Sequence, residues 1–130
     1  MSAGVSDSLG PCLRNVLLAM IVADEDVDPD EIVAAEQAYG EFTGQPLPDG
    51  ALEREASEAR SAGRSPEDLL QCLPADLERK ARETILTAAF RVASADGFVL
   101  EEEDALLRAV ATALGMDSSE ARGVLNRLMA

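Results

Sequence analysis

The sequence predicts an all-α protein, and three observations lead to this fold class. Alanine and leucine, which favour helices, are abundant among the apolar residues. Apolar residues recur at three- and four-residue steps, and no stretch shows the strict alternation of a half-buried strand. The six prolines fall between these periodic segments or in their first turns. We expect about seven helices in a single domain covering residues 1–130.

The first helix is expected from about Ser8 to Ala23. Pro11 favours this start, because proline is tolerated in the first turn of a helix and not in its interior. The apolar stripe of this helix comprises Leu9, Cys12, Leu13, Val16, Leu17, Met20 and Ala23.

The second helix is expected to follow Asp28, whose side chain can cap it. Pro29 then takes the first helical position and Glu31 the third, which is a form of the capping box. Gly44 is expected to end this helix. Its core residues are predicted to be Ile32, Ala35, Tyr39 and Phe42.

Two shorter helices are expected in the middle of the chain. After a turn over 45–50, one helix is predicted from Ala51 to Ala62, with Gly63 closing it. The next begins at a second capping sequence, Ser65 to Asp68.

The longest helix is predicted from Pro74 to about Ala95, and we expect it to be the central element of the fold. A further helix should run from Glu101 to about Leu114. The last should span Ser118 to Leu128, with Asp117 as its cap and Glu120 at the third position. The residues of the Glu101 helix expected to face inward are Leu106, Ala109, Val110 and Ala113.

An acidic turn occurs twice, 72 residues apart. The first acidic corner, residues 23–31, reads ADEDVDPDE, and the second acidic corner, residues 95–103, reads ADGFVLEEE. Both begin with Ala-Asp, have Val three residues after that Asp, and end in an acidic pair. The repeat predicts two related helix-turn-helix halves packed around the long central helix.

The charge of the chain excludes some partners. The sequence has 25 acidic and 11 basic residues, no histidine and a net charge of −14. We therefore expect it to be repelled by nucleic acid and by anionic lipid. The predicted central helix carries four cations, Arg79, Lys80, Arg82 and Arg91. They alternate with acids at helical pair spacing, so we interpret this side of the helix as a solvated face without a function.

We expect the protein to be cytoplasmic. Cys12 and Cys72 are isolated in apolar contexts, which is typical of free core cysteines in a reducing compartment. Residues 1–10 have no signal-peptide pattern, and no apolar run reaches membrane-spanning length, so no insertion into a membrane is expected.

The acidic corners are candidate cation sites. Helix capping accounts for one or two acids at each corner. It accounts less well for the ten acids between Arg14 and Arg54, a stretch without a basic residue. A bound hard cation would relieve their repulsion, and carboxylates without His or paired Cys favour Ca²⁺, Mg²⁺ or Mn²⁺. An EF-hand is excluded, because Pro29 stands where that loop needs glycine and Ala35 where it needs glutamate. No organic cofactor is predicted.

The chain resembles the TerB-like domain, the tellurite-resistance protein B family. The resemblance rests on LLAMIVAD at 17–24, VDPDE at 27–31, and the pattern from Ala95 to Leu107 that includes Gly97 and Val99. It implies an all-helical, non-enzymatic domain with an acidic divalent-cation site, linked to stress response and tellurite resistance. It also implies protein partners, including membrane-associated complexes.

The resemblance together with the acid spacing gives the candidate metal ligands. The chain departs from the family pattern at both corners. Glu25 stands where the family usually has glycine, which would strain or reshape the turn of the first corner. Leu100 stands where the second corner would need the equivalent of Asp28, so the first corner is the favoured site. The predicted ligands are Asp24, Asp28, Glu31, Asp96 and Glu103, with Asp26, Asp30 and Glu102 as secondary ligands.

Three functional hypotheses remain open. The first is a cation-responsive interaction module. The second is a purely structural adaptor whose acids only cap helices. The third, an enzyme with carboxylate-held Mg²⁺, is disfavoured because the chain has no His, phosphate loop or nucleophile elbow.

Overall fold

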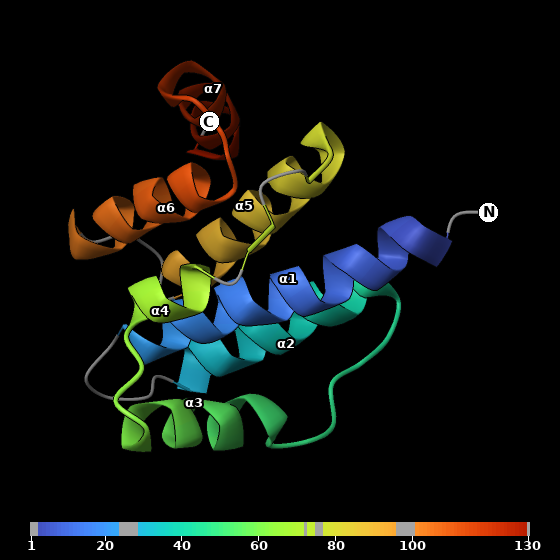
Figure 1. Cartoon of the computed structure of the whole chain (residues 1–130), viewed down its shortest axis with the longest axis vertical. Coiled ribbons are helices and arrows are strands. Elements are labelled where there is room, and N and C mark those ends of the chain that lie inside the picture. The colour runs from blue at the N-terminus through green and yellow to red at the C-terminus, as the bar shows by residue number, and fades with distance from the viewer. Residues whose placement is uncertain (1–2, 24–28, 72, 75–76, 96–100, 130) are drawn as a thin grey trace.

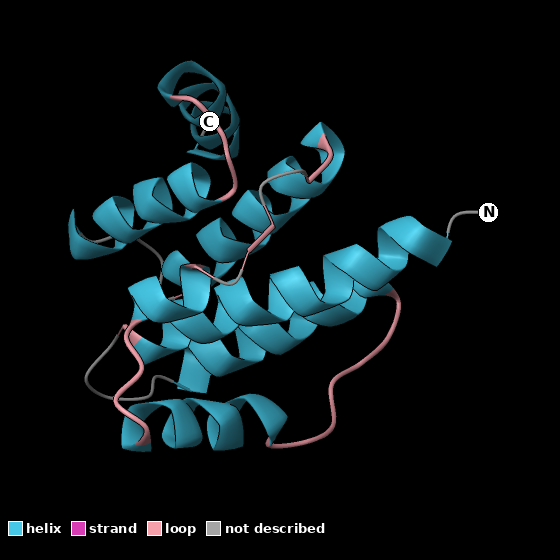
Figure 2. Ribbon diagram, viewed as in Figure 1, coloured by secondary structure: helices cyan, strands magenta, loops and turns pink. Residues whose placement is uncertain are grey.

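The computed structural model describes residues 3–23, 29–71, 73–74, 77–95 and 101–129, with the backbone alone for residues 3–8 and 102. These parts of the chain form seven helices and no strand (Figures 1 and 2), which confirms the all-α prediction. In none of the described helices are the length and apolarity sufficient for a membrane crossing.

The first helix, α1 (Ala3–Val22), starts earlier than predicted. Pro11 lies inside it and not in its first turn. Proline removes one backbone hydrogen bond from a helix interior, and here the helical backbone continues on both sides of it. Pro11 is exposed, whereas the following residues Cys12 and Leu13 are buried. The expected start near Ser8 is therefore wrong.

Local sequence signals place most limits of the next three helices close to the predicted positions, although α3 ends at Ser61 and not at Ala62, and the predicted cap Asp28 lies outside the described residues. Helix α2 (Pro29–Thr43) ends before Gly44, and α3 (Ala51–Ser61) ends just before Gly63; both glycines have positive φ. Helix α4 (Pro66–Leu70) begins with a complete capping box. In it, the Asp68 N–H donates to Ser65 Oγ at 3.1 Å, and the Ser65 N–H donates to Asp68 Oδ2 at 2.9 Å.

Helix α5 (Arg79–Ala93) is shorter than predicted, and α1 is the longest helix of the described chain. Leu77 is buried, and Glu78 is extended, with φ −64° and ψ 151°. The Leu77 carbonyl accepts a hydrogen bond from the Arg82 guanidinium at 2.7 Å. A side chain thus takes the place of the helical amide at Leu77, and the helix starts at Arg79 instead of at the predicted Pro74.

The last two helices are α6 (Glu101–Ala113) and α7 (Ser118–Met129). The predicted cap of α7 is present, since the Glu120 N–H donates to Asp117 Oδ1 at 2.7 Å. The predicted inward face of α6 is partly wrong, because Ala109 is exposed. The buried residues of this segment are Leu107, Val110, Ala111 and Leu114.

Two helices organise the core. Helix α5 contacts α1, α2, α6 and α7, while α1 contacts α2, α3, α4 and α5. In Figure 1, α1 and α2 lie along each other, with α3 below them and α6 and α7 above. The core therefore forms around α1 and α5 together. The proposed repeat of two halves stays a prediction, because the links from α1 to α2 and from α5 to α6 include undescribed residues.

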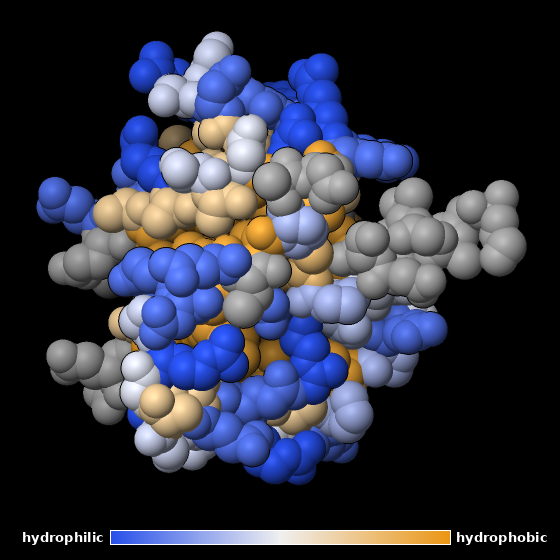
Figure 3. Space-filling view, in the orientation of Figure 1, coloured by the Kyte–Doolittle hydropathy of each residue, from blue (hydrophilic) through white to orange (hydrophobic). Residues whose placement is uncertain are grey.

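The core is built from aliphatic side chains. Its largest fully buried members include Leu13, Leu17, Ile21, Ile85 and Leu86. Alanines such as Ala35, Ala38, Ala88 and Ala89 are also buried, which lets helix axes approach closely. Cys12 is a free, buried cysteine, and burial raises the pKa of its thiol. Figure 3 shows hydrophilic side chains over α3 and α7 and hydrophobic residues mainly along α6 and beneath it.

Candidate functional site

The helix that leads into the first acidic corner is capped by a cation from another helix. At the end of α1, the Ala23 N–H donates to the Ala19 carbonyl at 3.1 Å. The neighbouring Ile21 carbonyl accepts a hydrogen bond from Arg60 Nη2 of α3 at 3.2 Å. A guanidinium here offsets the negative end of the helix dipole. Arg60 is 36 residues from Asp24 in sequence, so sequence analysis did not associate it with this corner.

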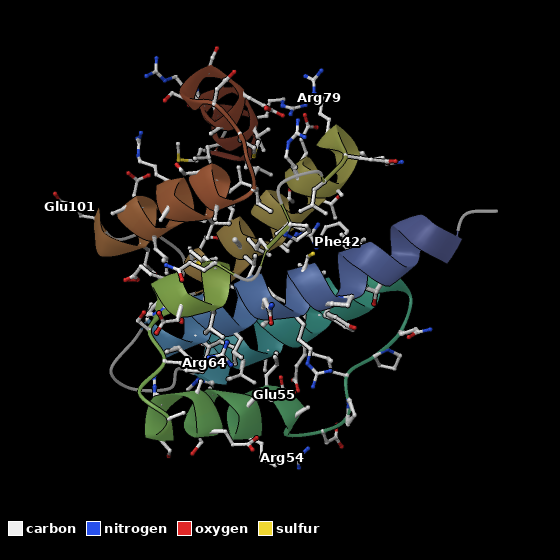
Figure 4. All side chains as sticks on the ribbon, in the orientation of Figure 1. Phe42, Arg54, Glu55, Arg64, Arg79 and Glu101 are labelled. Carbon is white, nitrogen blue, oxygen red and sulfur yellow. The ribbon has the colours of Figure 1, made fainter. Side chains whose placement is uncertain are left out.

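A second arginine fixes α3 to the same helix. Arg14 of α1 forms a two-point ion pair with Glu55 of α3, in which Arg14 Nε lies 3.0 Å from Glu55 Oε1 and the other contact joins Nη2 to Oε2. Figure 4 shows Glu55 on the side of α3 that faces α1, while Arg54 points away from it. Helix α3 is therefore held to α1 at two places, by the Arg14–Glu55 ion pair and by the hydrogen bond from Arg60 to Ile21.

Glu31 is the one charged side chain among the described residues that is buried, with 6% of its surface exposed. It lies in the first turn of α2, at the end of the first acidic corner, whereas Pro29 and Asp30 beside it are exposed. A carboxylate is expensive to bury unless it is hydrogen-bonded, paired or metal-bound, and a helix N-terminus favours it. Sequence analysis selected Glu31 as a capping residue and ligand but did not predict its burial.

The second acidic corner begins where α5 ends. The Ser94 hydroxyl donates to the Phe90 carbonyl at 2.9 Å, and the Ala95 N–H donates to the Val92 carbonyl at 3.2 Å. On the far side of the corner, Glu101 is exposed and points away from the body of the molecule (Figure 4). Glu103, two residues further along α6, is half-buried.

The predicted ligand set is only partly described. Asp24, Asp26, Asp28 and Asp96 lie outside the described residues, and Glu102 is described by its backbone alone. In the described part of the chain, no group of three or more His, Cys, Asp or Glu side chains could hold a metal ion. Asp30, Glu31 and Glu103 therefore do not make a metal site by themselves. A site at either corner would need the aspartates outside the described residues.

The helix ends around the two corners lie on one side of the molecule. In Figure 1 the end of α1, the start of α2, the end of α5 and the start of α6 all lie toward the left of the view. Helix α5 also contacts both α1 and α2.

Comparison with known families gives one match. The family model described as "Tellurite resistance protein TerB" matches residues 13–125. That range starts in α1, ends in α7 and includes both acidic corners. Neither the curated proteins nor the solved structures contain a match to this chain.

Proposed function

The chain belongs to the tellurite resistance protein TerB family, and on this premise we propose that it is a non-enzymatic interaction module that binds a divalent cation at its acidic corners. Family membership makes it a tellurite-resistance-associated domain. The cation, the stress-response role, the cytoplasmic location and a protein partner, including a membrane-associated complex, are parts of the proposal.

The observation that carries the proposal is the buried carboxylate of Glu31. It is inside the protein at the end of a segment in which Asp24, Glu25, Asp26 and Asp28 follow one another without a cation. Like charges this close raise one another's pKa values and disfavour the compact state unless a positive charge joins them. Glu31 would provide a buried ligand whose position is fixed by α2, and the aspartates would supply the other ligands of the ion.

The donor chemistry limits the ion. Every proposed ligand is a carboxylate, and the chain has no His, so Ca²⁺, Mg²⁺ or Mn²⁺ fits better than Zn²⁺ or copper. The first corner would supply Asp24, Asp28 and Glu31, and the second would supply Asp96 and Glu103. The ion would reduce repulsion and fix the angle between the helices at each corner, and a partner would recognise that ordered acidic surface.

Thermal unfolding tests the cation. The protein is melted in chelator and then with millimolar Ca²⁺, Mg²⁺ or Mn²⁺, with NaCl at matched ionic strength as the control. At a hundredfold excess over Kd, binding stabilises the fold by about 2.7 kcal/mol. For a chain of this length that corresponds to a rise in Tm of about 10 °C. A shift no larger than that in NaCl would remove the cation from the proposal.

Matched variants locate the site. Glu31→Gln keeps the size of the side chain and removes a charged ligand, so it should abolish most of the cation-dependent rise in Tm. Asp49→Asn removes one charge from the exposed turn before α3 and should leave that rise unchanged. If both variants lose the cation-dependent rise in Tm to the same extent, the ion only screens the net charge of the protein.

A structural adaptor is the second candidate, and Arg60 favours it. Its guanidinium already lies at the end of α1, next in sequence to the acidic segment, so a protein cation could reduce the repulsion there. The double variant Asp24→Asn with Asp96→Asn discriminates between the two functions. If the acids only cap helices and repel, this variant should be at least as stable as the wild type in chelator and should show no altered cation response.

A further inference from the structure

A groove runs between α5 and α7 on a part of the fold that the acidic corners do not include. One hollow of about 690 Å³ is lined by Arg79, Arg82 and Glu83 of α5 and by Gly123, Val124 and Arg127 of α7. A second hollow of about 370 Å³ shares Glu83, Val124 and Arg127 with it and extends to Phe42 and Lys80. Because they share these residues, the two hollows form one continuous surface, the α5–α7 groove.

The groove has a charge opposite to that of the whole chain. Four of the 11 basic residues line it, namely Arg79, Lys80, Arg82 and Arg127, while the net charge of the protein is −14. The acids among its lining residues are Glu83, Asp117 and Glu120. The groove is thus a local excess of positive charge on an acidic protein, and it attracts anionic groups that the rest of the surface repels.

The cations at the rim are available for a partner. Arg79 is paired with Glu83 at 3.1 Å, and Arg127 approaches the other oxygen of Glu83 at 3.7 Å, so two guanidinium groups share one carboxylate. The exposed fractions of these arginine side chains are 77% and 69%. Lys80 is exposed and has no ion pair with a described residue. Figure 4 shows Arg79 extending from the first turn of α5 on the side of α7.

Apolar side chains line the floor of the second hollow. Val124 and Leu128 of α7 and Phe42 of α2 line it, and Arg91 lies over the Phe42 ring at 4.8 Å from its centroid. A Cβ added at Gly123 would meet nothing within 4 Å, so glycine leaves free space beside Val124. Cations on the rim and apolar residues on the floor match an amphipathic segment better than a small inorganic ion.

We propose that the α5–α7 groove binds an acidic amphipathic helix of a partner protein. Carboxylates of that helix meet Lys80, Arg79 and Arg127, and an apolar side chain covers Val124 beside Gly123. This interaction does not involve the acidic corners and does not require a divalent cation. The proposal for the α5–α7 groove can therefore be tested independently of the proposed function.

The test uses the 130-residue chain and a labelled synthetic helix that carries Glu on the flanks of a Leu stripe. Binding is followed by fluorescence anisotropy in chelator at low salt, and amide chemical shifts locate the contact. We expect the shifts at residues 79–84 and 123–128. A peptide of the same sequence with Lys in place of Glu should bind at least about tenfold more weakly, because its charges meet like charges.

Two variants of the protein separate charge from shape. Lys80→Glu should weaken binding about tenfold, whereas Arg54→Glu makes the same change in net charge on an exposed residue of α3 and should have little effect. Gly123→Gln fills the groove without changing any charge and should also weaken binding. Because Gly123 is exposed in a helix, this variant should not lower Tm.

Several outcomes would overturn the proposal. The proposal is wrong if the Lys peptide binds as tightly as the Glu peptide, or if Arg54→Glu weakens binding as much as Lys80→Glu. It is also wrong if Gly123→Gln binds the peptide with the affinity of the wild type. If inorganic phosphate alone reproduces the shifts and displaces the peptide, the groove is a small-anion site. If the peptide dissociates a dimer seen by sedimentation, the occupant is a second copy of the chain. A response to Ca²⁺, Mg²⁺ or Mn²⁺ bears only on the acidic corners.

Discussion

Arg60 of α3 donates a hydrogen bond to the Ile21 carbonyl of α1 at 3.2 Å, so one helix caps the end of another. The contact joins residues 39 positions apart and lies immediately before the acidic segment of the chain. It places a cation at the helix end that leads into the first acidic corner.

Removal of the Arg60 guanidinium should destabilise the protein. Arg60→Met keeps the length of the side chain and removes the hydrogen bond, and we expect a loss of about 1–2 kcal/mol. Urea unfolding followed by circular dichroism measures it. Arg54→Met on the same helix is the control, because Arg54 is exposed, and its effect should stay within about 0.5 kcal/mol. Equal effects in the two variants would show that the contact with Ile21 contributes nothing.

Arg82 and Glu120 should couple α5 to α7. Their side chains are 22% and 19% exposed, Arg82 Nη2 lies 3.1 Å from Glu120 Oε2, and Arg82 also donates to the Leu77 carbonyl. Arg82→Met loses both bonds and should cost about 2 kcal/mol. Glu120→Gln keeps an acceptor and should cost less than about 1 kcal/mol.

A double-mutant cycle of these two changes, measured by urea unfolding, isolates the pair. We expect a coupling energy of about 1 kcal/mol. The buried Nε of Arg82 has no hydrogen-bond partner among the described residues, so the arginine is held through its two terminal nitrogens. A coupling energy of zero would mean that Glu120 does not help to hold it.

The capping box at α4 should contribute less to the stability of the fold at low pH. Hydrogen bonds from the backbone and side chain of Ser65 lower the pKa of Asp68 below its ordinary value of 3.8. A carboxyl group whose pKa is lower in the folded state stabilises the fold above its unfolded pKa, and it loses that effect as the pH falls through the folded pKa.

The comparison is between wild type and Asp68→Asn. Wild type should be more stable at neutral pH, and the difference should shrink as the pH falls below about 3.8, the ordinary pKa of the group. Carboxyl carbon NMR gives the pKa directly. Ser65→Ala removes the hydroxyl, so it should raise the pKa of Asp68. A stability difference that is constant with pH would contradict the role of its charge.

The same substitution at two glycines should have opposite effects. Gly63 has φ of +73° where α3 ends, and its N–H donates to the Arg60 carbonyl. Gly63→Ala should cost about 1–2 kcal/mol, because alanine is strained in that conformation. Gly123 lies inside α7 with free space around it, and Gly123→Ala should stabilise the protein by about 0.5–1 kcal/mol. Thermal melts of both variants check this pair.

Helix limits that depend on local chemistry could be predicted from the sequence. The Ser65–Asp68 box, the Asp117 cap and the stop at Gly63 are all set by residues within four positions of one another. The all-α class could be predicted for a similar reason, since helical periodicity is itself a local pattern.

Features set by distant residues could not be predicted. The late start of α5 is a local exception, because the side chain of Arg82, five residues from Leu77, donates to the Leu77 carbonyl. The face of α6 was misassigned at Ala109, because in a segment rich in Ala and Leu two neighbouring stripes have the same period and only packing selects one. At the candidate site, the choice of Glu31 followed from spacing, but its burial and the approach of Arg60 to the end of α1 depend on how the helices pack in three dimensions.

Helix α3 is held to the rest of the fold mainly by small side chains and two arginine contacts. Its buried residues are mostly alanines, with Leu52 as the one large side chain, and its main contacts are with α1 and α2. Loss of the Arg14–Glu55 pair and of the Arg60 cap would release it while α1 and α5 stay packed. Its amides should therefore exchange with deuterium through a sub-global opening, ahead of those in α1 and α5. Such an opening would expose the Ile21 end of α1 to solvent without global unfolding.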